Sequence, residues 1–170
     1  MMRFVSLICA FSILSAQTGT NLILYEQTRE AMERSLAGDI TRLDLVILPA
    51  GKIRPNVYGD YAIGYGGQLH EDLSLPNPAF FQRLDWVIKK AESRKIQVRI
   101  LVSDSDSVFL GKNSAEKWFD FGRYLGRRYM KTKNLVWLRL FEPSAGPLLS
   151  LEEGIRQFDS VHRFELFKRP

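Results

Sequence analysis

Short apolar runs alternate along this sequence with longer segments whose apolar residues recur at helical spacing. The runs occupy residues 20–25, 44–49, 96–102, 134–141 and 163–167. The helical segments between them occupy residues 28–43, 79–95, 113–129 and 150–159. Strands that alternate with helices of this length are typical of βαβ units, which assemble into a parallel sheet. The sequence therefore predicts an α/β domain with about five parallel strands.

Two architectures accept this order of elements: an open doubly wound sheet and part of a (β/α)8 barrel. A doubly wound domain that binds nucleotides carries a glycine-rich turn after its first strand. The residues after Leu24 are Tyr-Glu-Gln-Thr, so nucleotide binding is not supported. A complete barrel takes about 250 residues. We therefore expect residues 17–170 to form one incomplete TIM-barrel-like domain.

The first sixteen residues have the composition of an export signal. Arg3 supplies a positive charge, and Phe4–Ala16 contains no charged residue. A basic start, a short apolar run and a small last residue are the parts of a secretory signal peptide, with cleavage expected after Ala16. A membrane anchor is the alternative, but the run is shorter than the roughly 20 residues that span a bilayer. We expect a secreted or periplasmic protein that has no membrane contact after cleavage.

Cysteine content and charge narrow the class of protein further. Cys9 is the one cysteine and lies in the expected signal peptide, so the mature part must be held together by its core rather than by disulfides. The formal net charge of +5 falls to +4 when Arg3 is removed. This mild excess is compatible with an acidic polysaccharide and equally with an ordinary solvated surface. No cluster of Lys and Arg interleaved with aromatic residues indicates nucleic-acid binding.

Capping residues mark where three of the predicted helices begin. Asn77 stands directly before Pro78, which is the arrangement of an N-cap followed by proline at the first helical position. Asn113 with Glu116 three residues later resembles a capping box. Ser150 is followed by a glutamate at the same spacing. We expect helices to start at these three points.

Ligands of parallel βα folds bind at the carboxyl ends of the strands, in the loops that lead into the helices. The loop after the second predicted strand runs from Pro49 to Pro76, and loops beyond about 12–15 residues are usually functional or disordered. Its tyrosines and glycines are suited to stacking on sugar rings, or alternatively to packing the loop onto the rim of the barrel. We name Asn56, Tyr58 and Tyr65 as candidate substrate-binding residues.

Acidic residues stand at the next two predicted strand ends. Asp104 and Asp106 alternate with serines, a pattern that hydrogen-bonds a sugar, binds a cation or, most often, caps a turn. Glu142 follows the next strand, where a carboxylic acid is well placed for general acid/base catalysis. A surface glutamate paired with Arg139 is the alternative. We name Asp104 and Asp106 as substrate-binding and Glu142 as catalytic.

The remaining candidate chemistry is not supported by the residues. His70 and His162 do not have the spacing of a metal pair, and two acids alone are too few for calcium. No Gly-x-Ser-x-Gly motif marks a serine nucleophile. We therefore expect no metal and no cofactor.

Several short motifs, taken in order, resemble the apiosidase-like glycoside hydrolases, a family of secreted (β/α)8-barrel proteins that act on plant polysaccharides. The motifs are RPNVYG at 54–59, PNPAFF at 76–81, LDWV at 84–87, FGRYLGRRY at 121–129, NLVW at 134–137 and GIRQFD at 154–159. The similarity extends from Thr28 to the end of the sequence. Several ordered motifs are more specific than any one of them.

The resemblance implies a retaining glycosidase with its acid/base at the end of the fourth strand and a carboxylate nucleophile on a later strand. The family ends its fourth strand in Gly-Gly-Asp, where this sequence has Leu140-Phe141-Glu142, so Glu142 is the implied acid/base. The nucleophile would lie beyond Pro170. Retaining hydrolysis needs two carboxyl groups about 5–5.5 Å apart. The resemblance thus predicts a truncated, amino-terminal part of such an enzyme that is inactive alone.

Two other functions remain open. The first is a non-catalytic secreted module that binds carbohydrate through the tyrosine-rich loop 50–75. The second is a structural one, because an incomplete barrel leaves its first and last strands with unpaired edges, which favours self-association.

Overall fold

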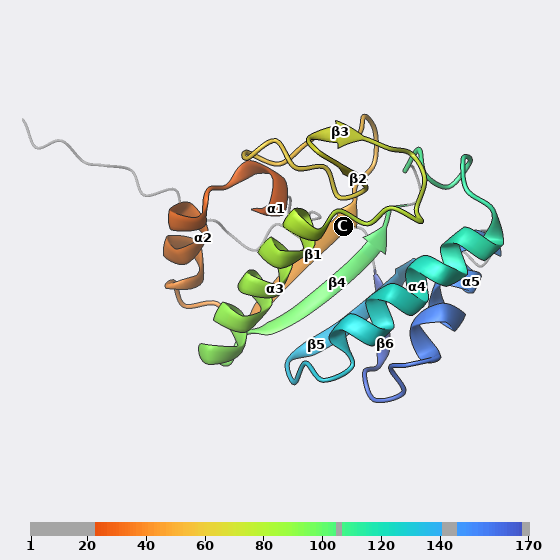
Figure 1. The fold of residues 1–170 in the computed structure, drawn as a ribbon. Helices are drawn as coiled ribbons and strands as arrows, with labels where there is room; N and C mark the ends of the chain where they lie inside the picture. The colour runs from red at the N-terminus through yellow and green to blue at the C-terminus, as the bar shows by residue number, and fades with distance from the viewer. Residues whose placement is uncertain (1–22, 105–106, 141–145, 168–170) are drawn as a thin grey trace, which may run out of the picture.

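The centre of the structure is a parallel sheet of four strands in the order β1-β4-β5-β6 (Figure 1). The computed structural model describes residues 23–104, 107–140 and 146–167. The strands are β1 Arg42–Leu48, β4 Gln97–Ser103, β5 Leu135–Leu140 and β6 Phe164–Phe167. Each lies within about two residues of a predicted run, the usual uncertainty of strand ends. The prediction of an α/β fold with a parallel sheet is confirmed.

Three long helices connect these strands. They are α3 Pro78–Ser93, α4 Ala115–Tyr129 and α5 Gly146–Arg156. Each helix leads from one strand to the strand beside it in the sheet (Figure 1). Because strand–helix–strand crossovers are right-handed in nearly all proteins, strands that follow one another in this way carry all their helices on one face.

The two faces of the sheet are packed differently. Alternate strand residues such as Leu45, Ile100 and Trp137 form one large buried cluster with the helices. The residues between them form a separate small cluster on the opposite face: Val46, Leu101, Leu138 and Phe167. A doubly wound sheet carries helices on both faces, so the described part of the chain has the layering of a barrel wall.

A charged cluster also lies on this second face. Arg99 of β4 pairs with Asp44 of β1 through two hydrogen bonds and reaches Glu165 of β6, with 3.4 Å between Nη1 and Oε2. Hydrogen bonding to Asp44, partly opposed by burial, raises the pKa of Arg99. Since β5 lies between β4 and β6, this bridge forms most easily when the sheet curls toward the charged face, as strands do in a barrel.

The first predicted strand, 20–25, is wrong over the residues that the structure describes. Ile23–Glu26 is a short helix, α1, whose first three residues are buried. A short apolar run does not distinguish a strand from a buried helical turn, and here Tyr25 reaches β1 by donating its hydroxyl to the Ile47 carbonyl. Helix α2 spans Arg29–Leu36 with Thr28 as its N-cap and ends before Gly38, earlier than predicted.

Only one of the three predicted helix starts is confirmed. Asn77 caps α3 by accepting a hydrogen bond from the Ala79 N–H. The cap of α4 is Ser114, not Asn113, and α5 begins at Gly146, before Ser150. Within the described ranges, none of the helices has the length and hydrophobicity that a bilayer span requires. The predicted signal peptide lies outside the described residues.

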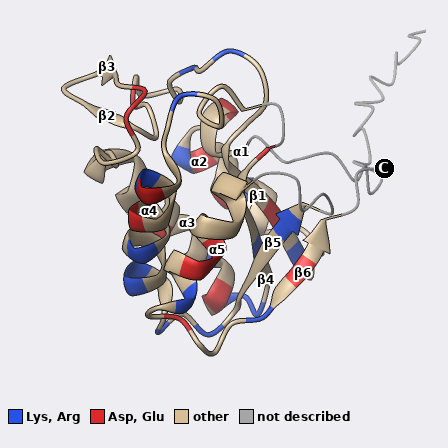
Figure 2. Ribbon diagram, turned by 90° about the vertical axis from the view of Figure 1, so that its right-hand side faces the viewer, with Lys and Arg blue, Asp and Glu red and all other residues tan. Residues whose placement is uncertain are grey.

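Helices α4 and α5 approach each other very closely because glycines line their contact. A side chain at Gly122 would overlap the Leu151 carbonyl oxygen, and one at Gly126 would overlap that of Ile155. Glycine pairs four residues apart let two helix backbones touch. Lys and Arg residues lie along α4 (Figure 2). Two arginines, Arg127 and Arg128, stand in its last turn, where cations interact favourably with the negative end of the helix dipole.

The long loop after β1 contains a small antiparallel hairpin of β2 Gly64–Tyr65 and β3 Gln68–Leu69. The hairpin lies beyond the carboxyl ends of the strands, at the top of Figure 1. A bridge between Ile63 and Pro76 closes its base. The long loop is therefore an ordered part of the rim.

Candidate functional site

The loops after β1 and β4 are joined where the two strands end. The Asp104 N–H donates to the Leu48 carbonyl oxygen over 3.0 Å, and Gly51 forms a bridge with Ser107. Asp104 is buried, and its carbonyl accepts a hydrogen bond from the Ser107 N–H at 3.1 Å. The structure thus places Asp104 at the predicted strand tip, within a tight turn. Asp106 and Glu142 lie outside the described residues.

Asn56 organises the first part of the long loop. Its side-chain oxygen accepts hydrogen bonds from the N–H groups of Tyr58 and Asp60, at 2.9 and 3.0 Å. The residue is 4% exposed, and its amide nitrogen has no hydrogen-bond partner in the described part of the chain. In this conformation Asn56 acts on a ligand only through the loop that it shapes.

Tyr58 leaves the rim and packs on the outer helices. Its hydroxyl accepts a hydrogen bond from the Arg29 N–H at the start of α2, over 2.9 Å. The guanidinium carbon of Arg83 in α3 lies 4.7 Å from the centre of its ring. Tyr58 thus packs against α2 and α3, whereas Tyr65 lies on the hairpin against His70, so the two predicted sugar-binding tyrosines do not form one cluster.

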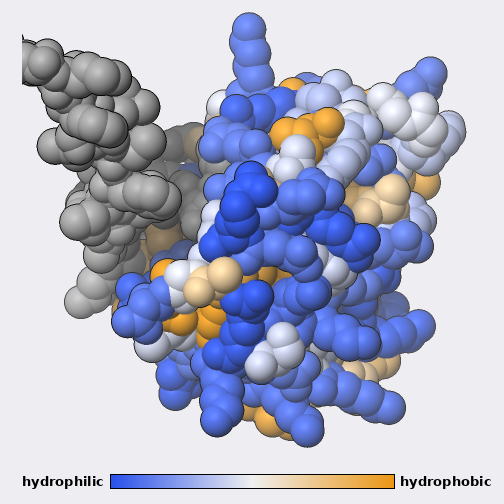
Figure 3. Space-filling view, turned by 90° about the vertical axis from the view of Figure 1, so that its left-hand side faces the viewer, coloured by the Kyte–Doolittle hydropathy of each residue, from blue (hydrophilic) through white to orange (hydrophobic). Residues whose placement is uncertain are grey.

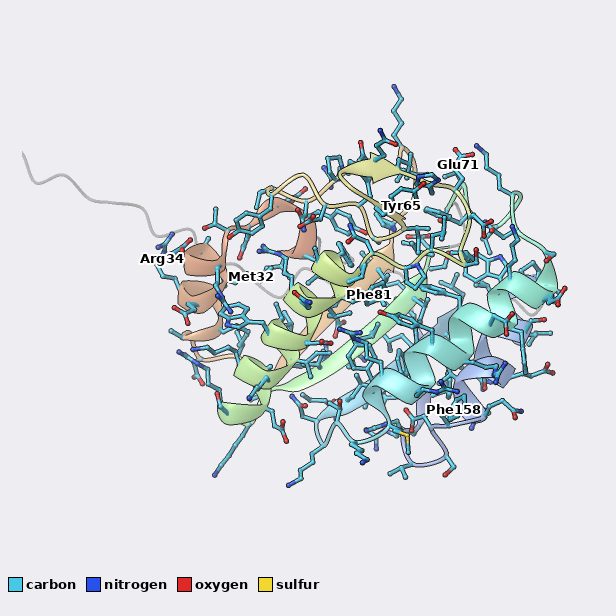
Figure 4. The ribbon with its side chains drawn as sticks, in the orientation of Figure 1. Met32, Arg34, Tyr65, Glu71, Phe81 and Phe158 are labelled. Atoms are coloured by element: carbon cyan, nitrogen blue, oxygen red, sulfur yellow. The ribbon has the colours of Figure 1, made fainter. Side chains whose placement is uncertain are left out.

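Tyr65 lies on the hairpin above the sheet (Figure 4). Its ring stacks on His70 with 4.5 Å between the ring centres and 17° between the planes. The residue is 59% exposed. Stacking fixes the orientation of the ring while much of its surface stays open to solvent, which is the property that a sugar-stacking residue needs.

The far end of the long loop is tied to the segment before α4. Lys117 pairs with Asp72 at 2.7 Å, and this hydrogen bond lowers the pKa of Asp72 to about 2. Asn113 receives a hydrogen bond from the Leu73 N–H and donates to the Glu71 carbonyl. Its predicted capping role is wrong because both ends of its amide are engaged by the loop. A buried asparagine between two loops had no signal in the sequence.

The tip of β1 is closed by packing. A cavity of only about 10 Å³ remains beside Leu48, Pro49 and Phe109. Tyr25 forms part of its wall, and burial raises the pKa of that tyrosine. No small molecule fits beneath the loop at this point.

A larger cavity, of about 350 Å³, opens where β4, β5 and α5 meet. It is lined mainly by leucines, and its polar groups include Arg139 and Glu152, whose side chains are 3.7 Å apart. Arg139 therefore pairs with a residue of α5 in the described structure. Leu140, the last described residue of β5, lines this cavity, whereas Glu142 lies outside the described residues.

Neither histidine belongs to a metal cluster. The ring of His70 stacks on Tyr65, and both ring nitrogens of His162 face oxygen acceptors, the Asp159 carboxylate and the Thr132 carbonyl. No group of three or more potential ligands occurs in the described ranges.

A parallel sheet with its connecting helices on one face, and with long loops at the carboxyl ends of its strands, is the arrangement of part of a (β/α)-barrel protein. The family described as "Apiosidase-like, catalytic domain" matches residues 24–160, and the chain belongs to this family. The resemblance seen in the sequence motifs is confirmed. No curated protein matches the sequence.

Solved structures give the same fold. A glycoside hydrolase family 5 protein from Bacteroides vulgatus has a TM-score of 0.70 at 19% identity, and the match covers 85% of this chain and 33% of that chain. A second structure, described as a glycoside hydrolase, has a TM-score of 0.68 at 15% identity and covers 85% and 34%. The chain thus spans about a third of the length of these TIM-barrel neighbours.

Proposed function

We propose that this chain is the acid/base-bearing part of a secreted glycoside hydrolase that acts on plant-type polysaccharide. The observation that carries the proposal is the family match over 24–160, in a sheet whose strand ends meet at one rim. Glu142 is the proposed proton donor, and Asp104 and Asp106 are the proposed sugar contacts on the neighbouring strand. In the apiosidase-like pattern the nucleophile belongs to a later strand, so residues 1–170 do not complete the double displacement alone.

The first prediction concerns turnover by the 170-residue chain. Incubated with aryl glycosides and pectic side chains, it releases no sugar above the buffer rate, because one carboxyl group does not support a two-step transfer. Reducing-sugar and aryl-release assays measure this. The proposal is contradicted if the chain shows turnover that is lost in Glu142→Gln but kept in the control Glu153→Gln, whose side chain is exposed.

A longer chain would give the proposal its positive test. In a longer chain with further βα units and measurable activity, Glu142→Gln should lower kcat/KM, which reports the acid-assisted first step, about 100-fold or more on natural substrate, because general acid catalysis contributes that much. The loss should be far smaller for aryl glycosides whose leaving group needs no proton. Equal losses on both substrates would contradict a proton-donor role.

A second candidate function is carbohydrate binding without catalysis, favoured by the exposed and stacked ring of Tyr65. In affinity electrophoresis against several plant polysaccharides, the chain should be retarded by one of them. Tyr65→Ala with Tyr58→Ala should restore free migration, whereas Tyr65→Phe should not, since the ring face is kept. Retardation that survives the double alanine change rules out this loop.

We also propose that the protein is exported from the cell that makes it. The predicted signal peptide 1–16, with cleavage expected after Ala16, supports a proposed location outside the cytoplasm. Amino-terminal sequencing of the exported protein should begin at Gln17. A chain that keeps Arg3 and stays with the membrane fraction contradicts the proposal.

A further inference from the structure

A second cavity of about 350 Å³ lies on the helical layer, where α2, α3 and the first part of the long loop meet. Its walls are Arg29, Tyr58, Asp60, Ala79, Gln82, Arg83 and Trp86. The molecular face on the side of α2 is hydrophilic over most of its area (Figure 3). The two aromatic rings in this cavity, Tyr58 and Trp86, therefore differ from the charged and polar residues that dominate the surface around them.

Each of the two rings is held in place by an arginine. The guanidinium of Arg29 lies 4.6 Å from the Trp86 ring centre, and that of Arg83 lies 4.7 Å from the Tyr58 ring centre. Tyr58 is also fixed by its hydrogen bond from the Arg29 N–H, yet it remains 54% exposed. The rings are preorganised and partly open, which lowers the entropy lost when a ligand binds.

Both arginines keep donors for an anion. Arg83 uses Nε and Nη2 on the carbonyls of Leu24 and Gln27, which leaves Nη1. The Arg29 guanidinium makes no hydrogen bond within the described part of the chain beyond its contact with the Trp86 ring. The charge of Arg29 also acts on Glu30 and Glu33, but neither arginine forms a salt bridge with a carboxylate of the described ranges. An entering anion therefore meets two cations that are free of close carboxylate contacts.

The remaining polar groups of the cavity indicate a ligand that carries hydroxyl groups as well as a negative charge. Asp60 accepts hydrogen bonds and repels a bare dianion, and Gln82 both donates and accepts. Aromatic walls, two cations and a separate acceptor together match a sugar ring that carries one carboxylate and several hydroxyls. The cavity volume is within the range of about 300–1,000 Å³ typical of small-molecule sites.

We propose that this cavity binds a carboxylate-bearing sugar unit of a polysaccharide, with Arg29 and Arg83 on the carboxylate and Tyr58 and Trp86 against the ring. It is a second binding site, because it lies on the helical layer and not at the carboxyl ends of the strands. The proposal rests on the polysaccharide class of the proposed function but not on catalysis, since Glu142→Gln should leave this binding unchanged.

The test titrates the 170-residue chain with a trimer of galacturonic acid, with a trimer of galactose as the neutral match and sodium acetate as the bare carboxylate. Calorimetry gives the affinity, and tryptophan fluorescence gives the location, because Trp118 and Trp137 are fully buried and only Trp86 lines this cavity. The acidic trimer should bind saturably and change the fluorescence. The neutral trimer and acetate should bind at least tenfold more weakly, as one charge-assisted hydrogen bond corresponds to about that factor.

Arg29→Gln should weaken binding of the acidic trimer about tenfold. Arg34→Gln is the matched control, since Arg34 is an exposed arginine of the same helix that does not line the cavity and points outward (Figure 4). Arg29→Lys keeps the charge but loses the paired N–H donors of the guanidinium. Its affinity for the acidic trimer should therefore lie between those of the Arg29→Gln and Arg34→Gln variants. Equal binding of the neutral trimer or of acetate, or equal affinity of the Arg29→Gln and Arg34→Gln variants, overturns the proposal.

Discussion

At the scale of single residues, Asp159 is the clearest case of a polar side chain that supports the core. It is completely buried. One carboxylate oxygen accepts from the indole N–H of Trp137 at 2.8 Å and from the His162 ring at 2.7 Å. The other accepts from the His162 backbone N–H at 3.0 Å. Asp159 thereby ties the end of α5 to β5 and to the start of β6.

Replacing Asp159 by alanine should lower the free energy of unfolding by about 3–5 kcal/mol, because it leaves buried donors without an acceptor. The exposed Asp39→Ala should change it little. Urea unfolding of both variants and the parent chain at pH 7 measures the difference. Equal midpoints for the two variants would contradict the assigned role.

The same carboxylate gives a direction for the pH dependence. Burial opposes ionisation, but the hydrogen bonds from Trp137 and His162 outweigh it and lower the pKa of Asp159 below its ordinary 3.8. A lowered folded-state pKa means that the stabilisation is complete above the ordinary value and is lost as pH falls through the folded-state pKa. The gap in stability between the parent chain and Asp159→Ala should therefore shrink in strong acid.

At the scale of elements, α4 and α5 depend on glycine at their contact. Gly154 of α5 faces the Phe119 carbonyl, so both helices contribute a position without room for a side chain. Because backbone atoms are the neighbours, the helices must separate to admit even a methyl group. This spacing of Gly122 and Gly126 was visible in the sequence but is not interpretable without knowledge of which helix lies opposite.

Gly126→Ala should lower the free energy of unfolding by about 1–3 kcal/mol through overpacking, despite the better helix propensity of alanine. Gly111→Ala is the matched control, since no atom lies within 4 Å of a side chain added there. Thermal unfolding followed by circular dichroism compares the two. A Gly126→Ala variant as stable as the control would show that the helices slide apart at no cost.

Elements with long periodic patterns were predicted well, and short ones were not. Asn77 and Pro78 fix the start of α3 through purely local chemistry. Ile23–Glu26 has too few residues to show a period, and its helical form is decided by packing on β1. Asn113 fails as a cap for a related reason: hydrogen bonds to the loop at Glu71 and Leu73 take its side chain.

At the scale of the whole molecule, the described sheet has two open edges. β1 pairs only with β4, and β6 pairs only with β5, within the described ranges. Unpaired strand edges present free N–H and C=O groups to other chains. We propose that the 170-residue chain self-associates through these edges.

Sedimentation velocity over a range of concentrations should show a dimer or larger species whose fraction rises with concentration. Leu166→Lys, on the exposed side of β6, should shift the equilibrium toward monomer, since charged residues protect edges. The exposed Val161→Lys, before the strand, serves as control. A monomer at all concentrations contradicts the proposal.

The sequence by itself determined the four strands of the parallel sheet and the three helices that connect them, the start of α3 and the family, because these depend on local periodicity and on contiguous motifs. Only the tertiary structure decided that α3, α4 and α5 cover one face of the sheet, that α1 is helical, and that Tyr58 contacts Arg29 and Arg83 rather than Tyr65. Those outcomes depend on contacts between residues far apart in the chain. Such contacts form only when the sheet is assembled, so the periodicity of the sequence does not predict them.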